Sequence, residues 1–113
     1  MTFTKRRKQR KSLSVPLLTG AFVLAAPAIA AADVAPLLQK GSCVACHSTD
    51  KKMLGPSFKD VAAKYKGKDM EAALVKKVKD GGSGAWGAMP MPPNAGKLTD
   101  DEFKAVVKWV LSL

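Results

Sequence analysis

The stretch Cys43-Val44-Ala45-Cys46-His47 decides how the rest of this chain is interpreted. The chain has 113 residues with two cysteines and one histidine, and all three lie within these five positions. A zinc site needs four ligands, and the sequence has no other cysteine or histidine to supply them. A thioredoxin-like redox pair would lie in a βαβ unit, which the sequence does not predict. A plain disulfide would leave His47 without a role.

The spacing C-x-x-C-H is the pattern by which a c-type haem is attached. Two thiols add to the two vinyl groups of one porphyrin, and the adjacent histidine lies beneath the ring and ligates the iron. The residues therefore predict one haem c per chain, bound covalently through Cys43 and Cys46. His47 is the expected axial ligand on one side of the iron.

A sixth iron ligand is often a methionine thioether, which raises the potential and keeps small molecules out. Met53 follows the haem motif too closely to reach the other face of the ring, and Met70 lies in the first turn of an expected helix. Met89 and Met91 lie in the proline-rich stretch 88–94. Because proline fixes φ, such a loop can hold a thioether near iron with little loss of entropy. The residues themselves leave both methionines as candidates.

Apolar residues at helical spacing predict short helices and no pair of strands. The first helix carries Val34, Leu37 and Leu38, with Pro36 in its first turn, and ends at Gly41. The last helix has its apolar positions at Phe103, Val106, Val107, Val110 and Leu111, and Trp109 on it is expected in the core.

Capping residues predict where the later helices begin. Ser57 should begin the second helix and Asp69 the third, and Thr99 forms a capping box with Glu102 at the last. Residues 81–97 are rich in glycine and proline, and we expect neither a helix nor a central strand there. The predicted fold class is therefore all-α.

The first part of the chain has the three parts of a secretory signal. Residues 1–11 are basic, residues 13–32 are uncharged with an apolar centre, and small-x-small patterns such as Ala28-Ile29-Ala30 follow. We expect residues 1–32 to be a cleaved signal peptide and residues 33–113 to be the functional domain. A retained membrane anchor is the alternative, because an uncharged stretch of this length can span a bilayer.

The charge of the chain is concentrated at its start. There are 19 Lys+Arg against 9 Asp+Glu, a net charge of +10, and six of the basic residues precede residue 12. The remainder has 13 basic and 9 acidic residues, a balance of +4. A nucleic-acid-binding domain would need a basic patch on the folded part, so no nucleic-acid partner is expected. The length allows one domain, too small for a large enzyme pocket.

From Cys43 onward the sequence resembles a small bacterial class I cytochrome c of the c-551/c-552 (c8) type. The matching stretches are residues 43–47, 53–62, 86–87 with 89–94, and 108–111. The resemblance implies an all-α class I cytochrome c fold, with about four short helices around one covalently attached haem. In that family the iron ligand is the methionine before Pro-Pro-Asn, which is Met91 here.

The same resemblance implies roles for residues around the haem. The carbonyl of Pro56 would accept a hydrogen bond from the ring N–H of His47, which fixes the tautomer of the ligand. Asn94 would donate to the sulfur of Met91, and the indole N–H of Trp86 would donate to a haem propionate. Lys77 lies where the family often has a basic residue near a propionate.

The function implied by the resemblance is one-electron transfer in the periplasm, without enzyme activity and without a small-molecule substrate. The expected partners are periplasmic redox proteins that dock at the exposed haem edge, so membrane contact would come only through membrane-bound partners. The donor could be a cytochrome bc complex, and the acceptor a nitrite reductase, a terminal oxidase or a peroxidase. Two alternatives stay open: a haem enzyme or gas sensor with an open sixth site, and an anchored haem module of a larger oxidase or reductase.

Overall fold

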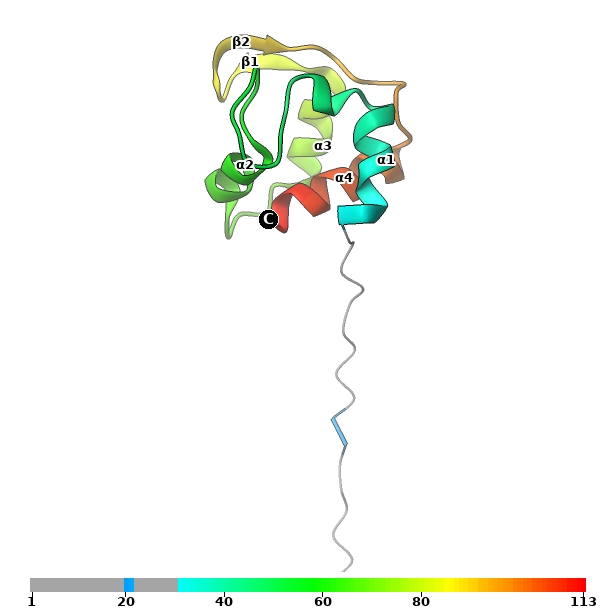
Figure 1. The fold of residues 1–113 in the computed structure, drawn as a ribbon. Coiled ribbons are helices and arrows are strands. Elements are labelled where there is room, and N and C mark those ends of the chain that lie inside the picture. Colours follow the sequence, from blue (N-terminus) through cyan, green and yellow to red (C-terminus); the bar gives the residue numbers. More distant parts are fainter. Residues whose placement is uncertain (1–19, 22–30) are drawn as a thin grey trace, which may run out of the picture.

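The computed structural model describes residues 20–21 and 31–113, and the fold in Figure 1 is that of the second range. The predicted signal peptide therefore lies mostly outside the described residues, but residues 31 and 32, next to its predicted cleavage site, are described and begin the first helix. The elements are α1 (Ala31–Lys40), a 3-10 turn η1 (Cys43–Ala45), α2 (Phe58–Tyr65), α3 (Glu71–Asp80), β1 (Gly82–Gly84), β2 (Gly87–Met91) and α4 (Asp100–Leu111). Among the described residues, no helix has the length and apolar character needed to cross a membrane.

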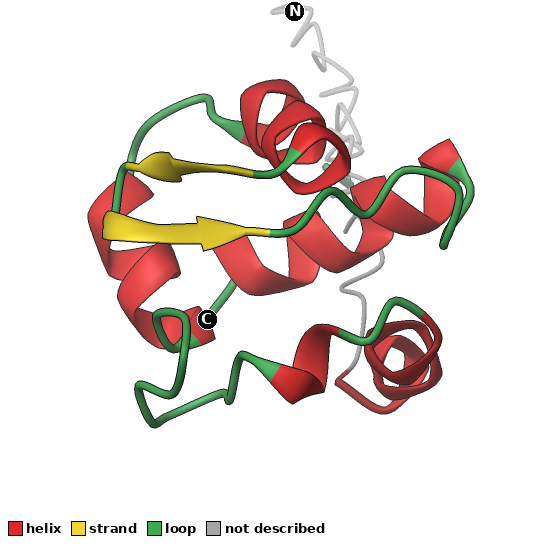
Figure 2. Cartoon of the chain, turned by 90° about the horizontal axis from the view of Figure 1, so that it is seen from above, coloured by secondary structure: helices red, strands yellow, loops and turns green. Residues whose placement is uncertain are grey.

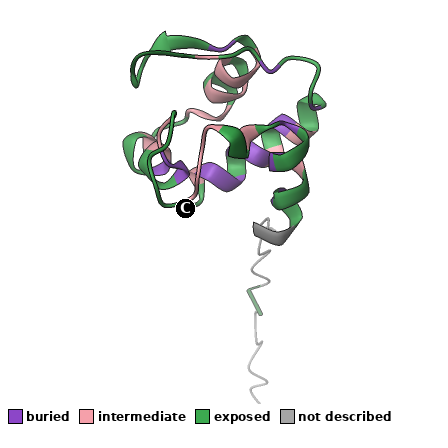
Figure 3. Cartoon of the chain, turned by 45° about the horizontal axis from the view of Figure 1, so that its top comes forward, coloured by how far each residue is buried: buried purple, intermediate pink, exposed green. Residues whose placement is uncertain are grey.

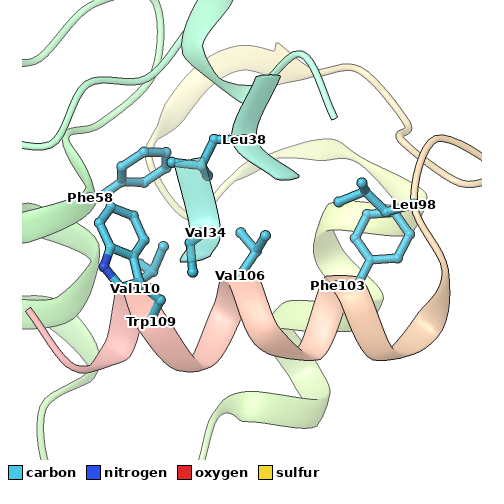
Figure 4. Packing of buried hydrophobic residues seen from close by; sticks show 8 residues of the cluster. All are labelled: Val34, Leu38, Phe58, Leu98, Phe103, Val106, Trp109 and Val110. Atoms are coloured by element: carbon cyan, nitrogen blue, oxygen red, sulfur yellow. The ribbon is translucent and has the colours of Figure 1, made fainter. Parts of the chain in front are cut away.

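Helix α4 provides the core against which the other helices pack. Its side chains Phe103, Val106, Trp109 and Val110 are buried and face residues from α1 and α2, as Figure 4 shows. These positions lie three or four residues apart, so they form one apolar face of the helix. The partners on the other elements are Val34, Leu38, Phe58 and Leu98. The predicted burial of Trp109 is confirmed, with 6% of its surface exposed.

Two of the three predicted N-caps are confirmed. The Ser57 hydroxyl accepts from the Asp60 amide at 3.0 Å, and Thr99 and Glu102 form a complete capping box. The third is wrong: Met70, not Asp69, occupies the N-cap of α3, and it makes no side-chain cap hydrogen bond. The first helix also starts earlier than expected, at Ala31, which places Pro36 inside it rather than in its first turn.

The absence of paired strands was a wrong prediction. Strands β1 and β2 pair antiparallel, with Gly82 opposite Met91 and Gly84 opposite Gly87. The register is irregular between Gly82 and Gly84. Figure 2 shows this hairpin, and Figure 3 shows that it is almost entirely exposed. The strands carry no alternating apolar pattern because they do not cover the helical core. Glycines in left-handed conformations, such as Gly84 at φ 110°, allow the chain to turn there.

Candidate functional site

A cavity of about 500 Å³ brings the predicted site residues together. Cys43, Cys46 and His47 line it, and so do Met89 and Met91. Met53 and Met70 are absent from its described lining, as their positions in the sequence suggested. Helices α2, α3 and α4 contribute apolar side chains to the remaining wall, namely Val61, Leu74, Val78, Val106, Val107 and Val110.

The imidazole of His47 is held in one orientation from several sides. Its Nδ1 lies 2.7 Å from the carbonyl oxygen of Pro56, so Nδ1 must carry the proton that is donated. In the neutral ring, Nε2 then has the free lone pair that a metal ligand needs. The ring also stacks on Phe58, with centroids 5.4 Å apart and planes 23° apart. Phe58 in turn meets Trp109 edge to face at 5.5 Å, which connects the imidazole to the core.

Gly55 gives this imidazole the space that it occupies. A Cβ at Gly55 would lie 2.5 Å from Cε1 of His47, closer than real atoms approach. The glycine is therefore required by a close approach of the ring to the backbone. Sequence reasoning missed this role, although the Gly55-Pro56 pair beside a single histidine is a signal that could have found it.

The two cysteines are half-buried at the cavity, and their thiols are not joined to each other. Burial raises the pKa of the Cys43 thiol, and a backbone hydrogen bond and the positive charge of Lys97 oppose that rise. The 3-10 turn η1 places the two thiols, and the amide of His47 donates to the carbonyl of Cys43 at 3.0 Å. The motif spacing thus keeps both thiols and the imidazole close together at one cavity.

The two methionine candidates differ in burial. Met89 is 65% exposed, whereas Met91 at the end of β2 is half-buried. They lie two residues apart on one strand and therefore share a face of it. Gly81 packs against the backbone next to Met91: a Cβ there would lie 2.4 Å from the Met91 carbonyl oxygen. In the sequence, Gly81 marks only the start of the glycine- and proline-rich stretch 81–97.

Asn94 has a different use from the one that the resemblance implied. Its side-chain amide donates to the carbonyls of Pro92 at 2.8 Å and Val78 at 3.2 Å, and its Oδ1 accepts from Lys97 at 3.0 Å. Both amide protons are thus used on backbone oxygens, so the structure does not show the donation to the Met91 sulfur. The backbone amide of Asn94 also bonds the end of α3, and the residue fastens the methionine segment there.

Trp86 lies in the turn of the hairpin, lines the cavity and is 42% exposed. The ammonium group of Lys64 lies 4.3 Å from the centre of its ring. Lys77 and Lys52 also line the cavity and form no ion pair within the described part of the chain. The carboxylates that do pair, such as Asp80 and Glu102, bond lysines away from the cavity.

These residues fit a haem. A largely apolar cavity carries two thiols and one imidazole whose remaining lone pair is free, and a half-buried thioether lies on another segment of the same lining. Thiols can bond vinyl groups, and imidazole and thioether are ordinary axial ligands of haem iron. The hydrogen bond from Nδ1 to a carbonyl is the usual support for such a ligand.

Comparisons with known proteins agree with the site. The model of the family described as "Cytochrome c" matches residues 31–113. Cytochrome c-551 of Pseudomonas aeruginosa is 51% identical over 83 residues, which are 73% of this chain and 78% of that protein. Cytochrome c-552 of Nitrosomonas europaea is 48% identical over 80 residues, or 70% of this chain and 77% of that protein.

The fold agrees as well. The crystal structure of wild-type Nitrosomonas europaea cytochrome c552 superposes with a TM-score of 0.65 and 46% identity, covering 70% of this chain and 98% of that one. The four α-helices and little sheet of the described residues confirm the predicted class I fold. The chain belongs to the cytochrome c family: it is a small electron carrier of the c-551/c-552 type, not an enzyme, and it binds haem c covalently, with Cys43 and Cys46 at the spacing of the attachment motif.

Proposed function

We propose that the haem iron is ligated by Nε2 of His47 and the thioether of Met91, and that the protein shuttles electrons between periplasmic respiratory partners. The observation that carries the ligand pair is that both residues line one cavity, with His47 Nδ1 already bonded to Pro56. The haem supplies the ferric–ferrous couple. The chain holds the imidazole, presents the thioether and surrounds both with apolar side chains, which favours the less charged ferrous state.

The ligand proposal is tested by two matched variants. Met91→Ala should remove the near-infrared charge-transfer band of the ferric protein, lower the reduction potential and let carbon monoxide bind the ferrous form. Met89→Ala should leave all three unchanged, because Met89 is largely exposed. The opposite pattern would assign the ligand to Met89.

Attachment at the two cysteines has its own test. Haem-dependent peroxidase staining should stay with the wild-type chain on a denaturing gel after expression with a haem-attachment system. Cys43→Ala and Cys46→Ala should each lose one of the two thioether bonds, visible as a shift of the pyridine haemochrome absorption. A wild-type chain that loses its stain would contradict the proposal.

Export to the periplasm rests on the basic, apolar and small-residue segments of residues 1–32. Cleavage is expected between Ala30 and Asp33, leaving a chain of about 81–83 residues. The intact mass of protein released from the periplasm without detergent measures this directly. A mass that retains residues 17–24 would favour the anchored form.

Docking is proposed to use an apolar rim at the cavity mouth. Val44 is 38% and Met89 65% exposed, and Ala45, Pro92 and Pro93 are exposed beside them. Redox encounters are small and short-lived, which suits a compact apolar contact. The proposed donors are quinol-oxidising cytochrome bc complexes, and the proposed acceptors are nitrite reductases, terminal oxidases or peroxidases.

The association rate with a redox partner, measured across ionic strength, tests this rim. Val44→Asp should slow association at every salt concentration, because it places a charge in the apolar contact. Lys51, Lys52 and Lys97, which are exposed, should lie further out and add a modest salt dependence. A steep salt dependence without any effect of Val44→Asp would reject the rim.

A further inference from the structure

Lys64 makes an unusual set of contacts for an exposed lysine. It lies in the last turn of α2, and its Nζ donates a hydrogen bond to the carbonyl oxygen of Ala85 in the hairpin turn. The same ammonium group lies 4.3 Å from the ring centre of Trp86 and 5.9 Å from that of Tyr65. One cation therefore contacts a carbonyl and two aromatic rings, and all three belong to residues that line the cavity.

The hairpin needs such a contact because little else holds its turn. A hairpin of two short strands is marginally stable in water by itself. Here the strands are exposed except for Met91, and three of their residues are glycines with positive φ, which supply no side chain to pack. Hydrogen bonds from Gly81 and Asn94 to α3 fasten the two ends of the hairpin segment.

The position of the turn affects the site. Strand β2 runs from the turn to Met91, and Ala85, Trp86, Met89 and Met91 all line the cavity. The hairpin turn lies above α2 at the same side of the molecule in Figure 1. A turn that moved away from α2 would open the cavity to water and loosen the strand that carries the thioether.

We propose that Lys64 is a positioning residue that fastens the hairpin turn to α2, and so keeps the cavity closed and Met91 in place. The proposal rests on the ligand pair of the proposed function. The long alkyl stem lets the ammonium group reach the turn from the helix, and a carbonyl oxygen and aromatic faces are favourable partners for a cation. Lys64 also lies in the last turn of α2, where a positive charge stabilises the helix end. The experiment must separate this effect on the helix from the contact with the hairpin turn.

The experiment compares amide hydrogen exchange in the ferrous holoprotein of the wild type, Lys64→Met, Lys64→Arg and Lys68→Met. Methionine keeps the length of the stem and removes the charge and the donor, whereas arginine keeps both. Lys68 is exposed and close to the same end of α2, and its side chain forms no ion pair or cation–π contact among the described residues, so Lys68→Met controls for the lost charge.

Lys64→Met should speed exchange at the amides of residues 83–86 by about tenfold, while α1 and α4 stay protected. Lys64→Arg should restore protection, and Lys68→Met should match the wild type. The reduction potential should fall further for Lys64→Met than for Lys68→Met, because the opened cavity admits water.

Three results would overturn the proposal: unchanged exchange in the hairpin, equal effects of Lys64→Met and Lys68→Met, or faster exchange confined to α2, which would assign the lysine to the helix end. Failure of the ligand proposal is seen separately, because Met91→Ala would then keep the near-infrared band while the exchange comparison could still be made.

Discussion

Two segments line the same cavity but are held in different ways. The histidine wall, residues 43–58, is built from backbone hydrogen bonds within itself, such as Gly55 to Cys46 at 2.9 Å and Phe58 to Ser48 at 2.9 Å. It continues through Phe58 into the buried core. The methionine wall, residues 81–94, is an exposed hairpin whose ends are fastened to α3 and whose turn contacts α2 through Lys64.

The difference indicates that one small domain can hold the two proposed ligands with unequal firmness. The imidazole is fixed by groups that the fold needs anyway, so its position is as stable as the domain. The thioether is held by a few polar contacts on an exposed strand, which open at a lower free energy than the whole domain. Variants of the histidine wall should therefore lower the stability of the whole domain, whereas variants of the methionine wall should loosen that wall locally.

The largest effect is expected from Phe58→Ala in the histidine wall. The side chain is 7% exposed and contacts both the His47 and the Trp109 rings, so truncation leaves a cavity in the core. The free energy of unfolding of the holoprotein, measured in denaturant, should fall by about 3–5 kcal/mol. Phe58→Leu, which keeps most of the apolar volume, should lose much less. A small effect of Phe58→Ala would contradict the proposal that Phe58 links the histidine wall to the buried core.

A pair of glycine variants should break the methionine wall selectively. Gly81 and Gly84 both have positive φ, at 71° and 110°, so alanine is strained at either. At Gly81 the new Cβ would also lie 2.4 Å from the Met91 carbonyl oxygen, whereas at Gly84 nothing lies within 4 Å. Gly81→Ala should therefore lower the free energy of local opening of the methionine wall, measured by hydrogen exchange, by about 2 kcal/mol more than Gly84→Ala. Equal effects of the two variants would mean that the alanine at position 81 and the Met91 carbonyl move apart without loss of stability.

Asn94→Ala should loosen the methionine wall by about 2 kcal/mol, because it leaves the Val78 and Pro92 carbonyls without their side-chain donor. The expected readout is loss of the ferric near-infrared band at lower temperature than in the wild type, ahead of global unfolding. Asn94→Asp keeps the acceptor for Lys97 but has no donor, and it should behave like the alanine variant. Wild-type behaviour of Asn94→Asp would show that the carbonyl bonds are unimportant.

Thr99→Ala should lower the stability of the domain without loosening one wall more than the other. It removes the N-cap of α4, where the Thr99 hydroxyl accepts from the Glu102 amide at 3.2 Å. The cost should be about 1 kcal/mol in the free energy of unfolding. Hydrogen exchange should rise in the first turn of α4 with both walls equally protected, and preferential opening of the methionine wall would contradict this assignment.

The smallest effect is a pH dependence at Glu102. Its hydrogen bonds to the Lys40 ammonium group, at 2.8 and 2.9 Å, and to the Thr99 amide lower the pKa of the carboxyl. The folded chain therefore releases this proton more readily than the unfolded chain, and the stabilisation is present above the ordinary carboxyl pKa. It should be lost as pH falls through the lowered pKa. Thermal unfolding of wild type and Glu102→Gln should differ most near neutral pH and converge in acid.

The sequence by itself determined the features that depend on neighbouring residues. The C-x-x-C-H spacing predicted the haem, and apolar spacing predicted α4 with its buried Phe103, Val106 and Trp109. Ser57 and Thr99 were recognised as N-caps because a cap bonds an amide three residues away. Interactions over a few residues can be read from a sequence because the chain itself brings those groups together.

Only the tertiary structure decided what depends on distant contacts. It showed that Met91 is half-buried and Met89 exposed, and that Asn94 bonds carbonyls of residues 78 and 92. It also showed the hairpin, which has no alternating pattern to predict it, and the contact of Lys64 with a turn 21 residues away. A lysine on a helix has no local mark of its partner, because the partner is brought close only when the chain packs around the cavity.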